Sequence, residues 1–212
     1  MKQIITLLLF VLGLTLQVHA QSAKSVLDKT SATFNQKGGI KATFTVKNFT
    51  GQKQTGTPIT GNIQLKGKKF RLNAEGITTW FDGKTQWTFI PENEEVNMTE
   101  PTDEELQAIN PYNFLNFYKK GFSYKFGKTQ KFQGKDIFEV TLLAKSNKMD
   151  IKQVVLFVEK SSYQLLQIKF RQGTNNWVSI TVNSFTGGLK LADSVFTFTE
   201  KDAPGAEIID LR

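Results

Sequence analysis

The chain of 212 residues contains no cysteine and only one histidine, His19. Without cysteine it forms no disulfide and offers no thiol to which an acyl chain can be attached. Ser-His-Asp catalysis, Cys-His catalysis and the usual zinc sites each need one of these two residue types. We therefore expect no metal, no cofactor and no catalytic site of these kinds. A pair of carboxylates, a Ser-Lys pair and binding without catalysis stay open.

Negative charge is also scarce, because the chain has 19 acidic and 27 basic residues, which gives a formal net charge of +8. A basic domain can attract nucleic acid or anionic lipid headgroups. The lysines of this sequence are scattered between apolar strand residues and do not cluster. This pattern is typical of a solvated sheet face, and we expect no nucleic-acid partner.

Only the N-terminal end carries a long apolar run. Lys2 precedes the almost wholly apolar residues 4–16, and Val18-His19-Ala20 forms a small-residue cleavage site. The run is too short for a comfortable membrane span. It predicts a cleavable secretory signal over residues 1–20 and a single periplasmic domain over residues 21–212. The alternative is an uncleaved membrane anchor.

Alternation of apolar and polar residues dominates the rest of the chain. Residues 40–49 read as a half-buried antiparallel strand. Residues 50–57 read as a polar loop, and residues 189–199 and 207–211 as the two last strands. We count about eleven strands in total. Helices are expected at residues 22–35, capped by Ser22, and in two short pieces between Pro101 and Gly121. The fold class is therefore mainly β with a few helices, as a curved sheet or an open barrel.

The hairpin at residues 77–90 is rich in aromatic residues on both sides of its Asp82-Gly83 turn. Period-two placement predicts one shared apolar face, although the turn leaves open which face Trp80 takes. The residues expected on this face, and in contact with a lipid, are Phe44, Val46, Ile63, Leu65, Phe70, Leu72, Trp80, Trp87 and Phe89.

Three small helices cover a large sheet incompletely, so a cavity between them is expected. The chain has 18 Phe but 4 Tyr, and rings without polar groups suit a site for acyl chains. A solid core filled by the same rings is the alternative. The segment between Pro101 and Gly121 is a candidate cover for the cavity. Its lipid-contacting residues would be Leu106, Ile109, Phe114, Leu115 and Phe117.

Three stretches resemble the LolA-type periplasmic lipoprotein carriers. They are D-G-K-T-x-W from Asp82 with the following Pro91, IKATFTVKNFTG at residues 40–51, and FTFTEKDAPGAEIIDL at residues 196–211. The resemblance implies an open antiparallel β-barrel with a helical lid enclosing a hydrophobic cavity. It also implies a monomeric, non-enzymatic carrier. Such a carrier takes acylated lipoproteins from an inner-membrane ABC-type release complex and delivers them to an outer-membrane acceptor.

One departure from the family concerns an Arg-Pro pair, whose arginine resembles a latch for the lid. The matching residues 65–70 contain no such pair, and Lys68 or Arg71 are the candidate substitutes. Two other functions stay open. One is a module that senses lipids or lipoproteins on the same fold. The other is a hydrolase with a carboxylate pair drawn from Glu94, Glu95, Asp103, Glu104 and Glu105.

Overall fold

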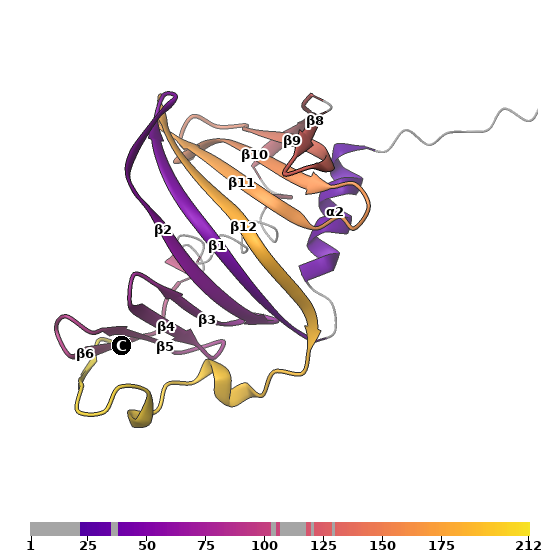
Figure 1. The fold of residues 1–212 in the computed structure, drawn as a ribbon. Coiled ribbons are helices and arrows are strands. Elements are labelled where there is room, and N and C mark those ends of the chain that lie inside the picture. Colours follow the sequence, from indigo (N-terminus) through magenta and orange to yellow (C-terminus); the bar gives the residue numbers. More distant parts are fainter. Residues whose placement is uncertain (1–21, 35–37, 103–104, 107–117, 120, 129) are drawn as a thin grey trace, which may run out of the picture.

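The computed structural model describes residues 22–34, 38–102, 105–106, 118–119, 121–128 and 130–212. Within these residues a 13-stranded sheet runs in the order β13-β6-β5-β4-β3-β2-β1-β12-β11-β10-β9-β7, with β8 paired to β9. The order does not return to its start, so the barrel stays open, as the resemblance implied. Figure 1 shows the long strands β1, β2 and β12 running past β3 to β6, which lie across one end of the molecule.

The strands, in chain order, are β1 (Gly39–Thr50), β2 (Lys53–Lys66), β3 (Lys69–Ala74), β4 (Ile77–Phe81), β5 (Gln86–Ile90), β6 (Glu95–Thr99), β7 (Phe122–Phe126), β8 (Gln130–Phe132), β9 (Lys135–Ala144), β10 (Ile151–Glu159), β11 (Leu165–Gln172), β12 (Asn176–Leu189) and β13 (Glu207–Asp210). Each neighbouring pair is antiparallel except β13 and β6, which are parallel.

The helix predicted at residues 22–35 is confirmed as α2 (Ala23–Phe34). Its first turn is capped as expected, because the Ser22 hydroxyl accepts a hydrogen bond of 3.0 Å from the Ser25 amide. Val26, Leu27 and Thr30 are buried along one side of the helix. Among the described residues, no helix has the length and apolar character needed to cross a membrane.

Two local predictions are wrong. Residues 50–57 are not a loop, because β2 begins at Lys53 and pairs with the end of β1 in a long hairpin. Residues 189–199 are not a strand. After β12 the chain forms two short 3-10 helices, η2 (Asp193–Phe196) and η3 (Glu200–Asp202), before β13. These helices lead the C-terminal segment back to the end of the sheet opposite β7 (Figure 1).

The core lies on one face of the sheet, which we call the inner face. Residues of α2 and inward-pointing residues from β1–β4, β7 and β9–β12 form one buried apolar cluster there. The opposite, outer face carries two smaller apolar clusters. One is at the β4–β6 end and the other is on β9, β10 and β11.

Candidate functional site

The inner face is the candidate lipid-binding surface. Six of the nine sheet residues predicted to share a face lie there together: Phe44, Val46, Ile63, Leu65, Phe70 and Leu72. The register explains their shared face, because each pairs across strands with a residue of the same side, as Ile63 does with Ala42 on one neighbour and Leu72 on the other. That these residues contact a lipid stays a prediction.

Close packing at the middle of this face depends on a glycine. Gly61 on β2 lies directly opposite Phe44 on β1. A Cβ atom at Gly61 would come within 2.5 Å of the Phe44 ring and 2.6 Å of the Asn73 carbonyl oxygen. Glycine therefore allows the ring of Phe44 to lie over the neighbouring strand.

The same apolar surface continues across β9–β12, which our site prediction did not include. It adds side chains without polar groups, exposed by 9% or less: Val140, Leu142, Val154, Leu156, Val158, Leu165, Ile168, Ile180 and Val182. On β9 and β12 their signal in the sequence is period-two spacing, but residues 154–158 are apolar without interruption, and Leu165 and Ile168 are three residues apart because of a register shift between β10 and β11. The inner face is thus an apolar surface spanning both halves of the sheet.

Tyr118 fastens the described end of the segment after Pro101 to α2. Its side chain is 0% exposed, and its hydroxyl donates a hydrogen bond to Asp28 Oδ1. Asp28 also accepts a 2.6 Å ion pair from Lys24 one turn earlier. The hydrogen bond from Lys24, followed by that from Tyr118, lowers the pKa of Asp28. Burial, followed by the bond to Asp28, raises the pKa of Tyr118.

A second contact holds α2 against the β10–β11 turn. Lys29 Nζ donates a hydrogen bond of 3.1 Å to the Tyr163 hydroxyl and lies 4.6 Å from the centre of the same ring. Tyr163 has a φ of 58°, which is uncommon for a residue with a side chain. The helix is therefore tied to the sheet through polar contacts at its exposed margin, in addition to its buried apolar side.

Of the residues expected in the lid, Leu106 packs against the inner-face cluster. Ile109, Phe114, Leu115 and Phe117 lie outside the described residues. The predicted capping box before them is present, because the Glu105 amide donates to the Thr102 hydroxyl at 3.3 Å and the Thr102 amide donates to Glu105 Oε2 at 2.7 Å.

Trp80, Trp87 and Phe89 do not share a face with the other six residues, so this part of the prediction is wrong. In the β3–β4 register Phe81 lies opposite Phe70, whereas Trp80 lies opposite Arg71. Trp80 is therefore on the outer face, where it packs edge-to-face on Phe198 at 5.5 Å between ring centres. The three aromatic residues form a cluster with Val96 and the C-terminal residues Phe198, Ala203 and Ala206.

Neither candidate for the missing latch forms a hydrogen bond or ion pair with the described residues of the segment after Pro101. Lys68 is exposed. Arg71 lies over the Trp80 ring, 5.1 Å from its centre, and 3.8 Å from Asp202. Arg71 therefore contacts the C-terminal segment on the outer face.

Lysines next to the candidate latch fix the start of the C-terminal segment. Lys66 Nζ donates to the Leu191 carbonyl and to Asp193 Oδ1, both at 2.8 Å. Lys69 reaches the other oxygen of Asp193 at 3.0 Å. These two ammonium groups, Lys66 first, lower the pKa of Asp193 to about 2.

Three of the acidic residues considered for catalysis are described by the structure, and they lie in a turn, a strand and a helix cap. Glu94 is exposed in the turn before β6, with a φ of 55°. Glu95 starts β6, and Glu105 caps the turn at Thr102, whose backbone hydrogen bond lowers the Glu105 pKa. Asp103 and Glu104 lie outside the described residues. Within the described part of the chain, no three Asp, Glu, His or Cys side chains gather in a way that could hold a metal ion.

Comparisons with known proteins point in the same direction as this geometry. The family described as outer membrane lipoprotein carrier protein LolA matches residues 14–174. None of the curated proteins compared with the sequence matches it. An uncharacterized conserved protein from Thermus thermophilus has a similar structure, with a TM-score of 0.59 and 11% identity over 89% of this chain and 98% of that chain. This likeness shows the fold alone.

Two further solved structures are more distant. A LolA superfamily protein from Nitrosomonas europaea has a TM-score of 0.43 and 11% identity, over 84% of this chain and 99% of that chain. A putative outer membrane lipoprotein-sorting protein domain from Vibrio parahaemolyticus has a TM-score of 0.44 and 12% identity, over 83% and 96%.

Proposed function

The chain belongs to the LolA family of outer membrane lipoprotein carrier proteins, and from this premise we propose that it shields the acyl chains of lipoproteins against its inner face. The observation that carries the proposal is the continuous apolar surface from β1–β3 to β9–β12, whose named sheet residues offer no hydrogen-bonding side chain. The family name describes a carrier, and the proposed activity is binding and transfer without catalysis.

The energetics explain why such a surface is needed. Moving one methylene out of water is favourable by about 0.8 kcal/mol. Exposing an acyl chain of about sixteen carbons to water therefore costs roughly 12 kcal/mol of free energy. A carrier must supply most of this shielding and still give up its cargo. Contacts at the margin of the surface, such as those of Tyr118 and Lys29 with their partners, are of a kind that can open without unfolding the sheet.

We further propose the route that the family resemblance implies. After removal of residues 1–20 the protein works in the periplasm as a monomer. It receives lipoproteins from an inner-membrane ABC-type release complex and passes them to an acceptor at the outer membrane. The segment between Pro101 and Gly121, including Ile109, Phe114, Leu115 and Phe117, serves as the lid.

Photo-crosslinking tests which face holds the acyl chain. A photoreactive amino acid replaces Leu72, on the inner face, or Gln64, on the outer face of the adjacent strand; both positions are half-buried. With a radiolabelled, triacylated lipoprotein as the probe, we expect a crosslink from position 72 and none from position 64. A crosslink from position 64 alone would overturn the assignment of the inner face.

Transfer is tested with the unmodified protein bound to the same lipoprotein. This complex is mixed with outer-membrane vesicles, which are then sedimented. A carrier releases the lipoprotein to the vesicle fraction. If the lipoprotein stays bound to the protein whatever the vesicles contain, the transport proposal fails and a sensing role is favoured.

A further inference from the structure

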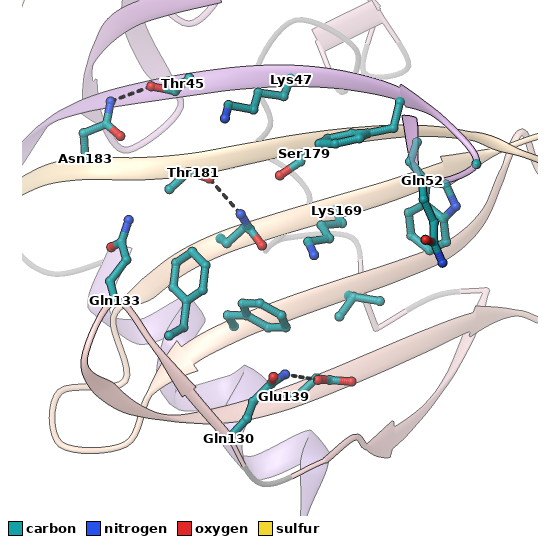
Figure 2. A pocket seen from close by; sticks show the side chains of 17 residues that line it. Thr45, Lys47, Gln52, Gln130, Gln133, Glu139, Lys169, Ser179, Thr181 and Asn183 are labelled. Carbon is teal, nitrogen blue, oxygen red and sulfur yellow. Dashed lines mark hydrogen bonds between the residues drawn. The ribbon is translucent and has the colours of Figure 1, made fainter. Parts of the chain in front are cut away.

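A second candidate binding site lies on the outer face, where a groove of about 930 Å³ crosses β1, β12, β11, β10 and β9 and continues to the β8–β9 turn (Figure 2). Its residues alternate with those of the inner face. Lys47 follows Val46 on β1, and Gln167 and Lys169 flank Ile168 on β11. The groove is therefore separated from the acyl-chain surface by the thickness of the sheet. Its volume falls within the range of small-molecule sites.

The chemistry of the groove differs from that of the inner face. Eleven of its 17 lining residues are polar, and most of these carry amide or hydroxyl groups. Amide side chains both donate and accept hydrogen bonds, and hydroxyls do the same. An acyl chain would take these groups away from water without replacing their hydrogen bonds. The groove therefore favours a ligand that is itself rich in hydroxyl groups.

Aromatic rings stand at both ends of this polar strip. Phe49 on β1 lies directly opposite Trp177 on β12. At the other end, Phe132 from β8 packs edge-to-face on Phe157, with ring centres 5.1 Å apart. All four rings line the groove. Flat apolar rings beside amides offer surfaces for the C–H faces of sugar rings, while the amides reach their hydroxyls.

One polar group in the floor lacks a partner. Gln167 is only 8% exposed, and its Nε2 donates to the Thr181 hydroxyl at 2.8 Å. Its Oε1 is buried and has no hydrogen-bond partner among the described residues. Buried carbonyl oxygens are nearly always hydrogen-bonded, so a small shift of this amide toward the groove would let the oxygen accept a hydrogen bond from a bound ligand or water. A ligand hydroxyl is a suitable donor.

Positive charge marks the centre of the groove. Lys47 is exposed and Lys169 half-buried, and neither makes an ion pair with any residue the structure describes. Lys169 Nζ lies 5.1 Å from the centre of the Phe157 ring. The one carboxylate of the lining, Glu139, lies on β9 and accepts a hydrogen bond from Gln130 (Figure 2). The two cations, on β1 and β11, are thus available for an anionic group.

We propose that this groove binds an acidic oligosaccharide, either free or as the headgroup of a glycolipid. Sugar rings stack on the Phe49–Trp177 and Phe132–Phe157 pairs, and their hydroxyls bond with the amides, including Gln167. The carboxylate or phosphate of the sugar pairs with Lys47 and Lys169. The site works independently of the inner face.

Isothermal titration of the full-length mature protein with tri-galacturonate tests this assignment. We expect tri-galacturonate to bind saturably and the neutral maltotriose to bind more weakly. The double change Lys47→Gln and Lys169→Gln should weaken tri-galacturonate binding by about tenfold or more, since it removes both charge-assisted contacts. It should leave maltotriose binding within about twofold.

Three controls separate the site from general charge and from misfolding. Lys41→Gln, exposed on β1 outside the groove, should leave binding unchanged. Lys169→Arg should retain it, because the charge is kept. Trp177→Phe keeps a ring and should retain binding while abolishing any change in tryptophan fluorescence on addition of the sugar. Loss of binding by Lys41→Gln to the same extent as by the double change would overturn the site.

The source of the sugar is separated with phosphatidylcholine vesicles with or without a sialylated glycolipid. Binding to the free sugar only, to the glycolipid vesicles only, or to both supports the site and identifies its source. The proposal is overturned if neither binds at millimolar concentration, or if a single-stranded oligonucleotide binds in their place. It is also overturned if the double change leaves tri-galacturonate binding as it was.

Discussion

Replacing Tyr118 with phenylalanine removes a single hydroxyl group and tests how the segment after Pro101 is fastened to α2. The Tyr118 ring is fully buried, so the substitution keeps the apolar packing and loses only the hydrogen bond to Asp28. A hydrogen bond to a charged group contributes about 1.5 to 3 kcal/mol. The Asp28 side chain is 40% exposed and keeps its ion pair with Lys24, so solvent screening reduces the value to about 1 to 1.5 kcal/mol.

Denaturant unfolding and hydrogen exchange measure this loss. We expect the Tyr118→Phe protein to unfold about 1 to 1.5 kcal/mol more easily at neutral pH, and the α2 amides to exchange faster. Tyr124→Phe is the matched control, because Tyr124 lies 6.4 Å from Tyr118 between ring centres and its hydroxyl makes no hydrogen bond with the described residues. An equal loss in both variants would refute the assignment to the Asp28 contact.

The same variant predicts a pH dependence with a definite sign. The folded-state pKa of Asp28 is lowered by Lys24 and Tyr118, so this carboxylate stabilises the fold above its ordinary pKa of about 4. That stability is lost as the pH falls through the lowered folded value. The difference between wild type and Tyr118→Phe should therefore be full at neutral pH and shrink in the acid range. A difference that grows as the pH falls would contradict this reasoning.

Two further substitutions test the two faces of the sheet. Phe70→Ala, at a fully buried inner-face position, should lower the free energy of unfolding in urea by about 3 to 5 kcal/mol. Its control Ile77→Ala, at a position that is 40% exposed, should lower it by less than about 1 kcal/mol. Similar losses in the two variants would show that the core lies elsewhere. Trp80→Ala removes the ring that packs on Phe198, so a protease should cut the C-terminal segment after η2, and mass spectrometry would detect the fragment. Trp177→Ala, at the far end of the outer face, should leave this segment uncut. An intact C-terminus in both variants would argue against this anchor.

The sequence predicts the inner face well where a strand alternates cleanly. Phe44 and Val46 could be placed together because polar residues separate them, and burial on one side of the sheet enforces that pattern. The same rule predicted α2 from its cap and apolar side. Such local signals determine the kind of element and its facing, which is why the open barrel could be expected before the structure.

Alternation did not predict which side of the sheet the side chains of β4 point to after the β3–β4 turn. Residues 78–81 read Thr-Thr-Trp-Phe, so two adjacent rings compete for the inner face and alternation alone does not choose between them. The choice depends on the register, which pairs Ala74 with Ile77 and so brings Phe81, not Trp80, beside Phe70. A shift by one residue would have reversed the result.

The other two errors have different causes. Residues 189–199 alternate like a strand, but Lys66 and Lys69 hold Asp193, and the chain turns through η2 instead of extending the sheet. Residues 53–57 are polar like a loop, but backbone pairing with β1 keeps them in the sheet although they are exposed. In the first case the partners are distant in the sequence, and no short window contains both. In the second case the partners are close, since Thr50 pairs with Lys53, and the polar composition alone made the second strand of the hairpin read as a loop.

The outer groove was missed for a physical reason that also bears on its role. A search for lipid-binding residues selects apolar positions, and the groove is built from the polar residues between them. The strand lysines, Lys47 among them, were read as part of a solvated face, yet Gln167 in the same groove is 8% exposed and carries a carbonyl oxygen without a partner among the described residues. A solvated face does not need to bury such a group. The strands β1, β11 and β12 therefore present different chemistry on their two sides: an apolar surface suited to acyl chains and a polar, aromatic one suited to sugars. Since each side uses alternate residues of the same strands, a substitution on one side changes one binding activity while the backbone that supports the other is retained.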